Sequence, residues 1–232
     1  MSDDTLEVLL QRFEDCIAQA DEAAARAILD ELRACAASDH PAVQLVQARY
    51  TWLADGPEAA QPLYRDLIAR DPEFADGVYD LGCIAEELED RAEMVTCFLK
   101  VRALDARVDR ELGIGSDAEL AHIEQVAREV LEHLPALFAE RLAHVPVIIE
   151  KRPSRELVAD GFDPRALGLF EGPTEGTTDV PMPTRIVLYA ANLLAEFPEE
   201  PELSEQIEVT VLHEVGHFFN LDEEQLERLG LS

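Results

Sequence analysis

The chain has 232 residues, 47% of them apolar, which is enough to build the core of one large domain or two small ones. Its 49 acidic side chains outnumber 19 lysines and arginines, and the resulting net charge of -30 repels phosphate backbones and anionic lipid surfaces. We therefore expect neither nucleic-acid nor membrane partners. The sequence holds no run of eighteen apolar residues and begins MSDDTLEVLL, with acids where a signal peptide carries lysine or arginine, so we expect a cytoplasmic protein.

The first half of the chain has the pattern of an all-helical domain. From Leu6 to about Val130, apolar residues recur at spacings of three and four, among many Ala, Leu, Glu and Arg residues. Two segments within it, YRDLIARDP (64–72) and FLKVRALDA (98–106), align at a shift of 34 residues. A repeat of this length is typical of solenoids built from helix-turn-helix units.

The repeated segments resemble tetratricopeptide repeats. Tyr64 and Phe98 stand where such a repeat packs an aromatic residue, and Ala60 stands at its small-residue position. Leu81 and Gly82 occupy the Leu-Gly position, which is small enough for two helices to approach closely. The resemblance implies a helical-repeat domain over residues 1–115. This domain consists of two repeats and, in front of them, a degenerate helical pair. Because the signature is short and degenerate, an ordinary helical bundle is the alternative.

The pattern changes after residue 106 to that of an α+β domain, which we expect over residues 116–232. Ser116 is a good N-cap for a helix expected from about Asp117 to His133. The runs HVPVIIEKRP (144–153) and TRIVLY (184–189) are rich in β-branched residues and predict two strands. Between them, residues 154–183 are rich in Gly and Pro, and we expect one long functional or partly mobile loop there.

The stretch VLHEVGHFF (211–219) contains the motif H-E-x-x-H inside a predicted helix from Leu203 to Phe219. On a helix, His213 and His217 lie one turn apart on the same face and can bind one Zn²⁺ ion. Zinc bound this way lowers the pKa of a water molecule to about 7, and Glu214 is placed to act as the general base. The alternative is an amphipathic helix that carries two unliganded histidines.

The sequence offers several candidates for the third metal ligand. Glu223 follows His217 by six residues, the offset at which extended motifs of this kind supply a third ligand. Asp222 is one residue nearer, and a more distant residue or water are further alternatives. Asp222 and Glu223 also suit the first turn of a helix, where acids are favoured by its dipole. Asn220 stands where such motifs place Gly, and Asn tolerates the same turn.

The second half, from about residue 117 to 231, resembles the small bacterial zincin-like metallopeptidases, or minimal zincins. The resemblance is carried by LPALFAERLAHVPVIIEKRP (134–153), LGLFEG (167–172), PTRIVLYAANL (183–193) and VLHEVGHFFNLDEEQLERLG (211–230). It implies a helix, a strand, a glycine-rich loop and a second strand before the motif helix, with zinc as cofactor and a small substrate cleft. Phe218 departs from the family, which commonly has a second His there, and Asn220 replaces its Gly.

These features lead to one leading hypothesis and one alternative. We expect a zinc-dependent metallopeptidase that hydrolyses peptide bonds, behind helical repeats that recruit a protein or peptide partner and favour basic segments. Tyr189 or Arg185 could donate a hydrogen bond to the oxyanion, and His144 could reach the metal. The alternative is an interaction scaffold whose zincin-like half binds a structural metal or has lost catalysis.

Overall fold

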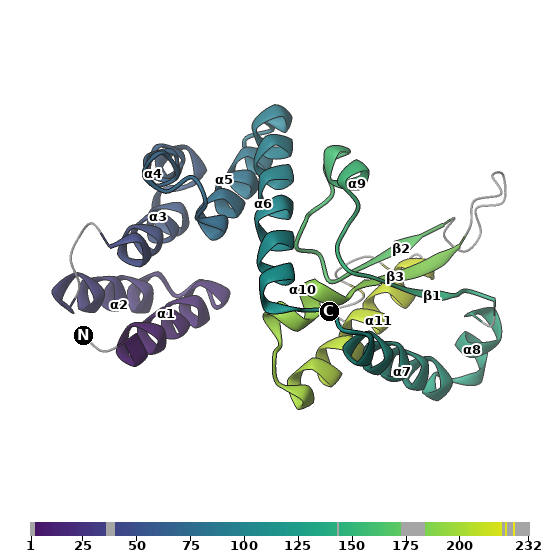
Figure 1. Cartoon of the computed structure of the whole chain (residues 1–232). Helices are drawn as coiled ribbons and strands as arrows, with labels where there is room; N and C mark the ends of the chain where they lie inside the picture. The colour runs from purple at the N-terminus through teal and green to yellow at the C-terminus, as the bar shows by residue number, and fades with distance from the viewer. Residues whose placement is uncertain are drawn as a thin grey trace. The chain divides into compact units, whose positions relative to one another are not determined.

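The computed structural model describes residues 3–35, 40–142, 144–172, 184–219, 221 and 225. It is mostly helical and contains, in this described part, one three-stranded sheet (Figure 1). The chain divides into two compact units: a helical unit, Met1–Leu104 with Ala159–Gly161, and a mixed unit, Asp105–Val158 with Phe162–Ser232. The domain boundary expected between residues 115 and 116 stays a prediction. None of the described helices is both long and apolar enough to cross a membrane.

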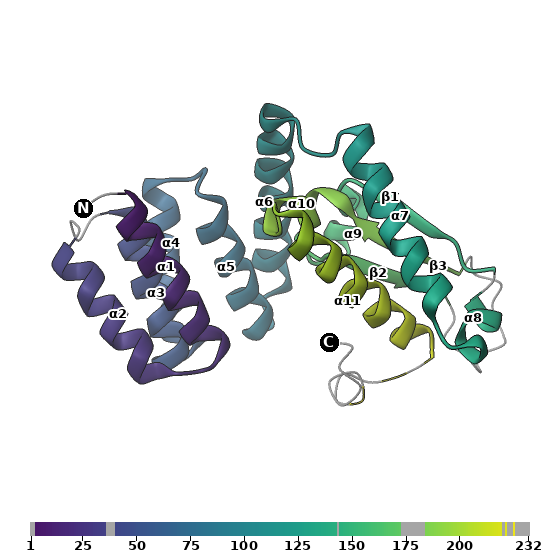
Figure 2. The same ribbon diagram turned by 90° about the horizontal axis from the view of Figure 1, so that it is seen from below.

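The helical unit is built from consecutive helices that each pack on the next, from α1 to α5 (Figure 2). They are α1 (Asp3–Ala18), α2 (Glu22–Cys35), α3 (Pro41–Asp55), α4 (Pro57–Arg70) and α5 (Ala75–Glu87), followed by α6 (Arg91–Leu112), whose first part belongs to this unit. The starts of α3 and α5 lie 34 residues apart, as do those of α4 and α6. The period in the sequence is therefore the spacing of helix pairs.

Side-chain packing in the helical unit agrees with the repeated positions. Tyr64 and Phe98 are both fully buried, as expected for the aromatic position. A Cβ atom on Gly82 would lie 2.6 Å from the ring of Phe98, so a larger residue would force these helices apart. The close approach expected at Gly82 is confirmed, while the assignment to tetratricopeptide repeats stays a prediction.

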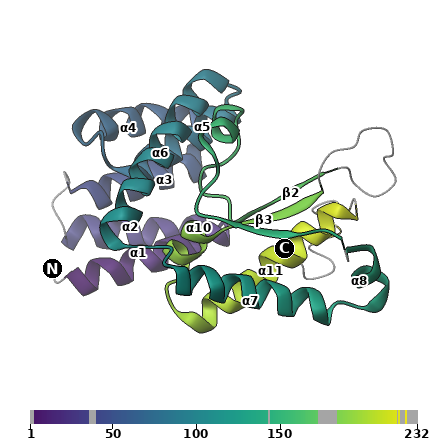
Figure 3. The same ribbon diagram turned by 45° about the vertical axis from the view of Figure 1, so that its right-hand side comes forward.

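The mixed unit contains a small sheet with helices on one of its faces (Figure 3). Its elements are α7 (Asp117–His133), α8 (Ala136–Leu142), β1 (Val147–Glu150), α9 (Arg155–Ala159), β2 (Gly168–Glu171), β3 (Arg185–Tyr189), α10 (Ala190–Glu196) and α11 (Glu200–Phe218), with Ala159 falling in the helical unit. The strand order is β1-β3-β2; β1 runs parallel to β3 and β2 antiparallel to it. Helices α7 and α11 pack on each other and on the same sheet face.

Local signals located most of these elements correctly. Helix α7 has the expected bounds and begins with a capping box, in which the Ser116 hydroxyl accepts from the Glu119 N–H and the Glu119 carboxylate accepts from the Ser116 N–H. The two expected strands are β1 and β3.

The expectation of one long loop over residues 154–183 was wrong, because this segment contains α9 and the edge strand β2. Strand β2 has only four residues and begins with Gly168, so its own sequence signal is weak. Its pairing with β3 and the packing of the partly buried Phe170 against the core stabilise the strand despite this weak propensity. Residues 173–183 lie outside the described part.

Candidate metal centre

The motif lies on α11, where a helix was expected. Pro201 and two acids, Glu200 and Glu202, occupy the first turn, as suits a helix N-terminus. One apolar stripe of the helix is buried in the core shared with α7 and the sheet: Leu203, Ile207, Val211 and Val215. This packing fixes the rotation of α11 about its axis. It therefore also fixes the direction in which His213 and His217 project from the neighbouring part of the helix surface.

His213 and His217 turn their rings toward each other on one face of α11. Their Nε2 atoms are 2.9 Å apart, and their ring centroids are separated by 4.5 Å with the planes nearly perpendicular. Two nitrogens on a tetrahedral zinc ion lie roughly 3.3 Å apart, given Zn–N bonds of about 2.0–2.1 Å. An opening of a few tenths of an ångström would let both imidazoles bind one ion, so this pair fits zinc.

The remaining predicted ligands cannot be placed with the histidines. Glu223, Asp222 and Asn220 lie outside the described residues, so their roles stay predictions. Over the described ranges, no group of three or more His, Cys, Asp or Glu side chains is arranged to hold a metal ion. His144 is exposed in the turn that precedes β1.

Glu214 points to the sheet and is buried, with 6% of its surface exposed. Its carboxylate lies against the backbone of β2: a Cβ atom on Gly168 would be 2.9 Å from Glu214 Oε1. The same Cβ would be 2.8 Å from the Thr210 methyl, one turn earlier on α11. Glu214 therefore follows His213 directly in the sequence, while its carboxylate is enclosed between helix and strand.

Two phenylalanines follow the second histidine and anchor the end of α11. Phe218 packs edge-on against Phe170 of β2, with centroids 5.8 Å apart, and Phe219 packs against Phe138 of α8 at 4.8 Å. Phe218, which departs from the zincin-like pattern, thus contributes apolar packing between the motif helix and the edge strand.

Tyr189 and Arg185 do not accompany the histidines. Both alternate along β3 with Ile186 and Leu188, which face the helices, so they belong to the opposite face of the sheet. Arg185 Nε is 2.5 Å from Glu171 Oε2. Burial raises the pKa of Tyr189, and nearby carboxylates add to the rise, so this phenol stays protonated at neutral pH. Glu214 is one of these carboxylates, so the phenol lies within electrostatic range of the proposed base, and a contact of Tyr189 or Arg185 with an oxyanion stays a prediction.

The comparison with known families bears on this part of the chain. Residues 142–231 match the family model described as zincin-like metallopeptidase. We refer to them as the zincin-like region; they contain all three strands and the motif helix. The match supports a zinc-dependent peptidase at the level of the family. It does not include residues 1–104, which form most of the helical unit. No curated protein matches the chain significantly.

A buried polar network supports the zincin-like region and was missed from the sequence. Asn192 of α10 donates from Nδ2 to the carbonyls of Pro164 (3.0 Å) and Ala166 (2.6 Å), just before β2. Its Oδ1 accepts from Arg152, whose guanidinium also binds Asp109 through two hydrogen bonds of 2.5 and 2.8 Å. The only sequence signal is one polar residue inside the apolar run YAANLLA.

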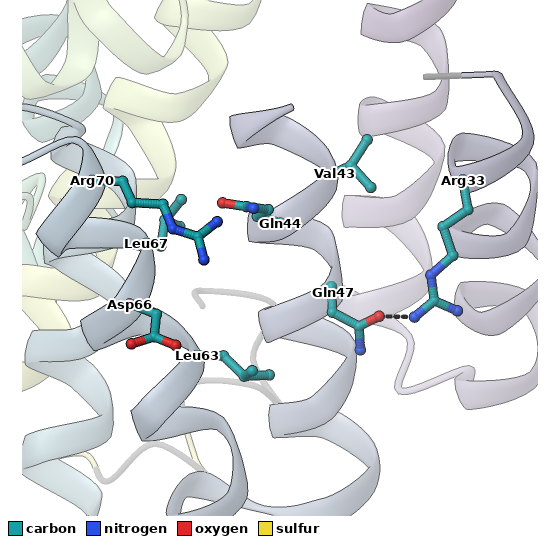
Figure 4. A pocket seen from close by; sticks show the side chains of 8 residues that line it. All are labelled: Arg33, Val43, Gln44, Gln47, Leu63, Asp66, Leu67 and Arg70. Carbon is teal, nitrogen blue, oxygen red and sulfur yellow. Dashed lines mark hydrogen bonds between the residues drawn. The ribbon is translucent and has the colours of Figure 1, made fainter. Parts of the chain in front are cut away.

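The helical unit carries a separate groove of about 290 Å³ between α2, α3 and α4 (Figure 4). Arg70 extends over it toward Gln44, while Arg33 is hydrogen-bonded to Gln47. Leu63 and Leu67 supply apolar lining. A groove with amides, guanidinium groups and aliphatic side chains can accept a peptide backbone and its side chains.

Proposed function

We propose that this chain is a zinc-dependent metallopeptidase that hydrolyses peptide bonds, with Glu214 as general base. The observation that carries the proposal is the convergence of two Nε2 atoms, 2.9 Å apart, beside a buried glutamate, within the zincin-like region. Two imidazoles and an adjacent carboxylate are the groups that metal-assisted hydrolysis requires.

Each residue has a separate task. His213 and His217 bind the metal, and Glu223 is proposed as the third ligand. When bound, zinc supplies Lewis-acid polarisation of the scissile carbonyl and makes water nucleophilic at neutral pH. Glu214 accepts the proton of the attacking water and delivers it to the leaving amine. Its burial against Gly168 supports this role, because a carboxylate held in one place needs little reorganisation during the reaction.

The proposed substrate class is supported by the strand beside Glu214. Within the described part of the chain, β2 pairs with β3 on one side and with no strand on the other. An extended peptide can add to such an edge through main-chain hydrogen bonds. We therefore propose that protein or peptide segments bind along β2, which brings their backbone close to the motif helix.

The helical unit is proposed to recruit a protein or peptide partner through the groove between α2, α3 and α4. The net charge of -30 favours basic partners of the chain as a whole and disfavours nucleic acids and membranes. The groove itself presents Arg33 and Arg70 beside one carboxylate, Asp66. We keep the cytoplasm as the proposed location on the basis of the sequence. The same groove favours the second candidate function, a scaffold whose zincin-like region binds metal without hydrolysis.

Metal analysis and one substitution separate these functions. We expect about one zinc per chain, by mass spectrometry, in protein purified without chelator or histidine tag, and its loss in His217→Ala. Glu214→Ala should keep the metal and abolish peptide hydrolysis. Zinc binding without hydrolysis in the wild type would favour the scaffold. A wild type that takes up no zinc even after reconstitution would overturn the metallopeptidase proposal.

A further inference from the structure

We propose that Gly168 is a positioning residue for Glu214: its lack of a side chain leaves the space in which the carboxylate of the base is held. This inference rests on the proposed function of Glu214. It adds a residue of the edge strand, distant in sequence from the H-E-x-x-H motif, to the requirements of the site.

The contacts at Gly168 leave no room for a methyl group. A Cβ atom there would lie 2.9 Å from Glu214 Oε1, 3.1 Å from Glu214 Cγ and 2.8 Å from Thr210 Cγ2, and real Cβ atoms essentially never come closer than 3.0 Å. The backbone itself does not demand glycine, because Gly168 is not among the glycines with positive φ. The requirement for glycine therefore comes from the neighbours on α11.

The strand cannot move away easily to relieve such a contact. Gly168 pairs with Leu188, and the carbonyl of the preceding Leu167 accepts from the Tyr189 N–H at 2.8 Å. Asn192 holds the carbonyl of Ala166 at 2.6 Å on the upstream side. Downstream, Phe170 packs against Phe218. The strand is thus fixed on both sides of the glycine.

The motif helix is equally restrained, because Val211 and Val215 are buried in the core beside Thr210 and Glu214. A methyl group at residue 168 would crowd both the Thr210 methyl and the Glu214 side chain. Glu214 can turn about its side-chain bonds, whereas the Thr210 hydroxyl is held by the Gln206 carbonyl at 2.8 Å. His213 and His217 point from another part of the helix surface, and the three atoms nearest to a Cβ atom at residue 168 belong to Thr210 and Glu214. A substitution at Gly168 should therefore displace the base and leave the metal-binding histidines in place.

Gly168→Ala tests this inference with three measurements: zinc content, steady-state hydrolysis of a peptide substrate, and thermal unfolding of the zinc-loaded protein. We expect about one zinc per chain, as in the wild type. We expect kcat to fall on the order of ten- to a hundredfold with KM little changed, since a small misplacement of a reacting group has effects of this size.

Double substitutions identify which contact matters, and the first of them does so without relying on activity. In the Glu214→Ala background, Gly168→Ala should lower the unfolding midpoint less than it does in the wild type, because the carboxylate is gone. In the Thr210→Ser background, the loss of kcat should persist, because only the methyl contact is relieved. Gly82→Ala is a matched control: its Cβ would crowd Phe98 at 2.6 Å, so it should destabilise the helical unit without changing zinc content or kcat.

The outcomes separate this inference from the proposed function. An active wild type with an unchanged kcat in Gly168→Ala would overturn the positioning role, and so would an equal unfolding penalty with and without Glu214. A wild type that binds zinc but hydrolyses no peptide would instead overturn the proposed function. The unfolding comparison would then still decide whether Gly168 places Glu214.

Discussion

The helical unit and the mixed unit each bury an arginine against carboxylates, with different structural consequences. In the helical unit, Arg49 of α3 binds Asp80 of α5 at 2.7 Å, and Asp80 accepts from the Tyr64 hydroxyl at 3.0 Å. In the mixed unit, Arg152 binds Asp109 and Asn192 and reaches Asp105 at 3.4 Å. The first network joins α3 and α5, which both pack on α4. The second holds the segment that leads into β2.

This difference indicates that a network of an arginine and carboxylates can have one of two roles. It can stabilise the fold alone, or it can stabilise the fold and also hold a functional site in place. Loss of the Arg49 network leaves the apolar contacts of α3, α4 and α5 in place, because their core is extensive. Loss of the Arg152 network releases Asn192, and with it the carbonyls of Pro164 and Ala166. The strand that contains Gly168 begins two residues later. Only the second network should therefore affect the proposed chemistry.

The largest effect is expected for Arg152→Met. This change leaves the nearly buried carboxylate of Asp109 without its arginine, while Asp105 keeps Arg165 at 3.1 Å, and breaking a buried ion pair costs about 3–5 kcal/mol of unfolding free energy. Urea denaturation measures the loss. We also expect peptide hydrolysis to fall while zinc content is retained, because β2 shifts and the histidines do not.

Arg128→Met is the matched control for Arg152→Met. Arg128 also pairs with a carboxylate, Glu124 at 2.6 Å, but both side chains are exposed. Exposed pairs contribute about 0–1 kcal/mol, so this variant should remain close to the wild type in stability and hydrolysis. Equal losses for the two variants would show that burial of the Arg152 network is not what makes it important.

A smaller effect is expected for Asp80→Asn in the helical unit. This change keeps the shape of the side chain and removes its charge beside Arg49, which should cost about 1.5–3 kcal/mol, the range for hydrogen bonds to charged groups. Zinc content and hydrolysis should not change. Asp30→Asn, at an exposed position, is the control. Reduced hydrolysis in Asp80→Asn would remove the contrast between the two networks.

The smallest effect is expected at the start of α7, for Glu119→Gln. Hydrogen bonds from Ser116 lower the pKa of Glu119. Because the pKa is lowered in the folded state, the charged form stabilises the fold at pH values above the unfolded-state pKa of about 4.3. This stabilisation is lost as the pH falls through the lower pKa of the folded state. Glu119→Gln should thus lower the unfolding midpoint at pH 7, and this difference should shrink as the pH is lowered below 4. A difference independent of pH would contradict a role for the charge.

Much of the fold was predictable because the relevant signals are local. Ser116 and Glu119 mark the start of α7, and apolar periodicity marks α11. The positions of His213 and His217 on one helix face follow from a spacing of four residues. Strand β2 was not predictable in the same way, because it has four residues, begins with glycine and depends on its pairing with β3.

The sequence by itself determined the helical periodicity, the motif and its proposed chemistry, since each depends on residues within one or two helical turns. Only the tertiary structure decided that Glu214 lies against Gly168, 46 positions earlier in the numbering, and that Asn192 holds the segment before this strand. It also placed Tyr189 and Arg185 on the sheet face opposite to α11. Contacts between residues so far apart are set by strand pairing and by the rotation of helices against the sheet, which no local pattern encodes.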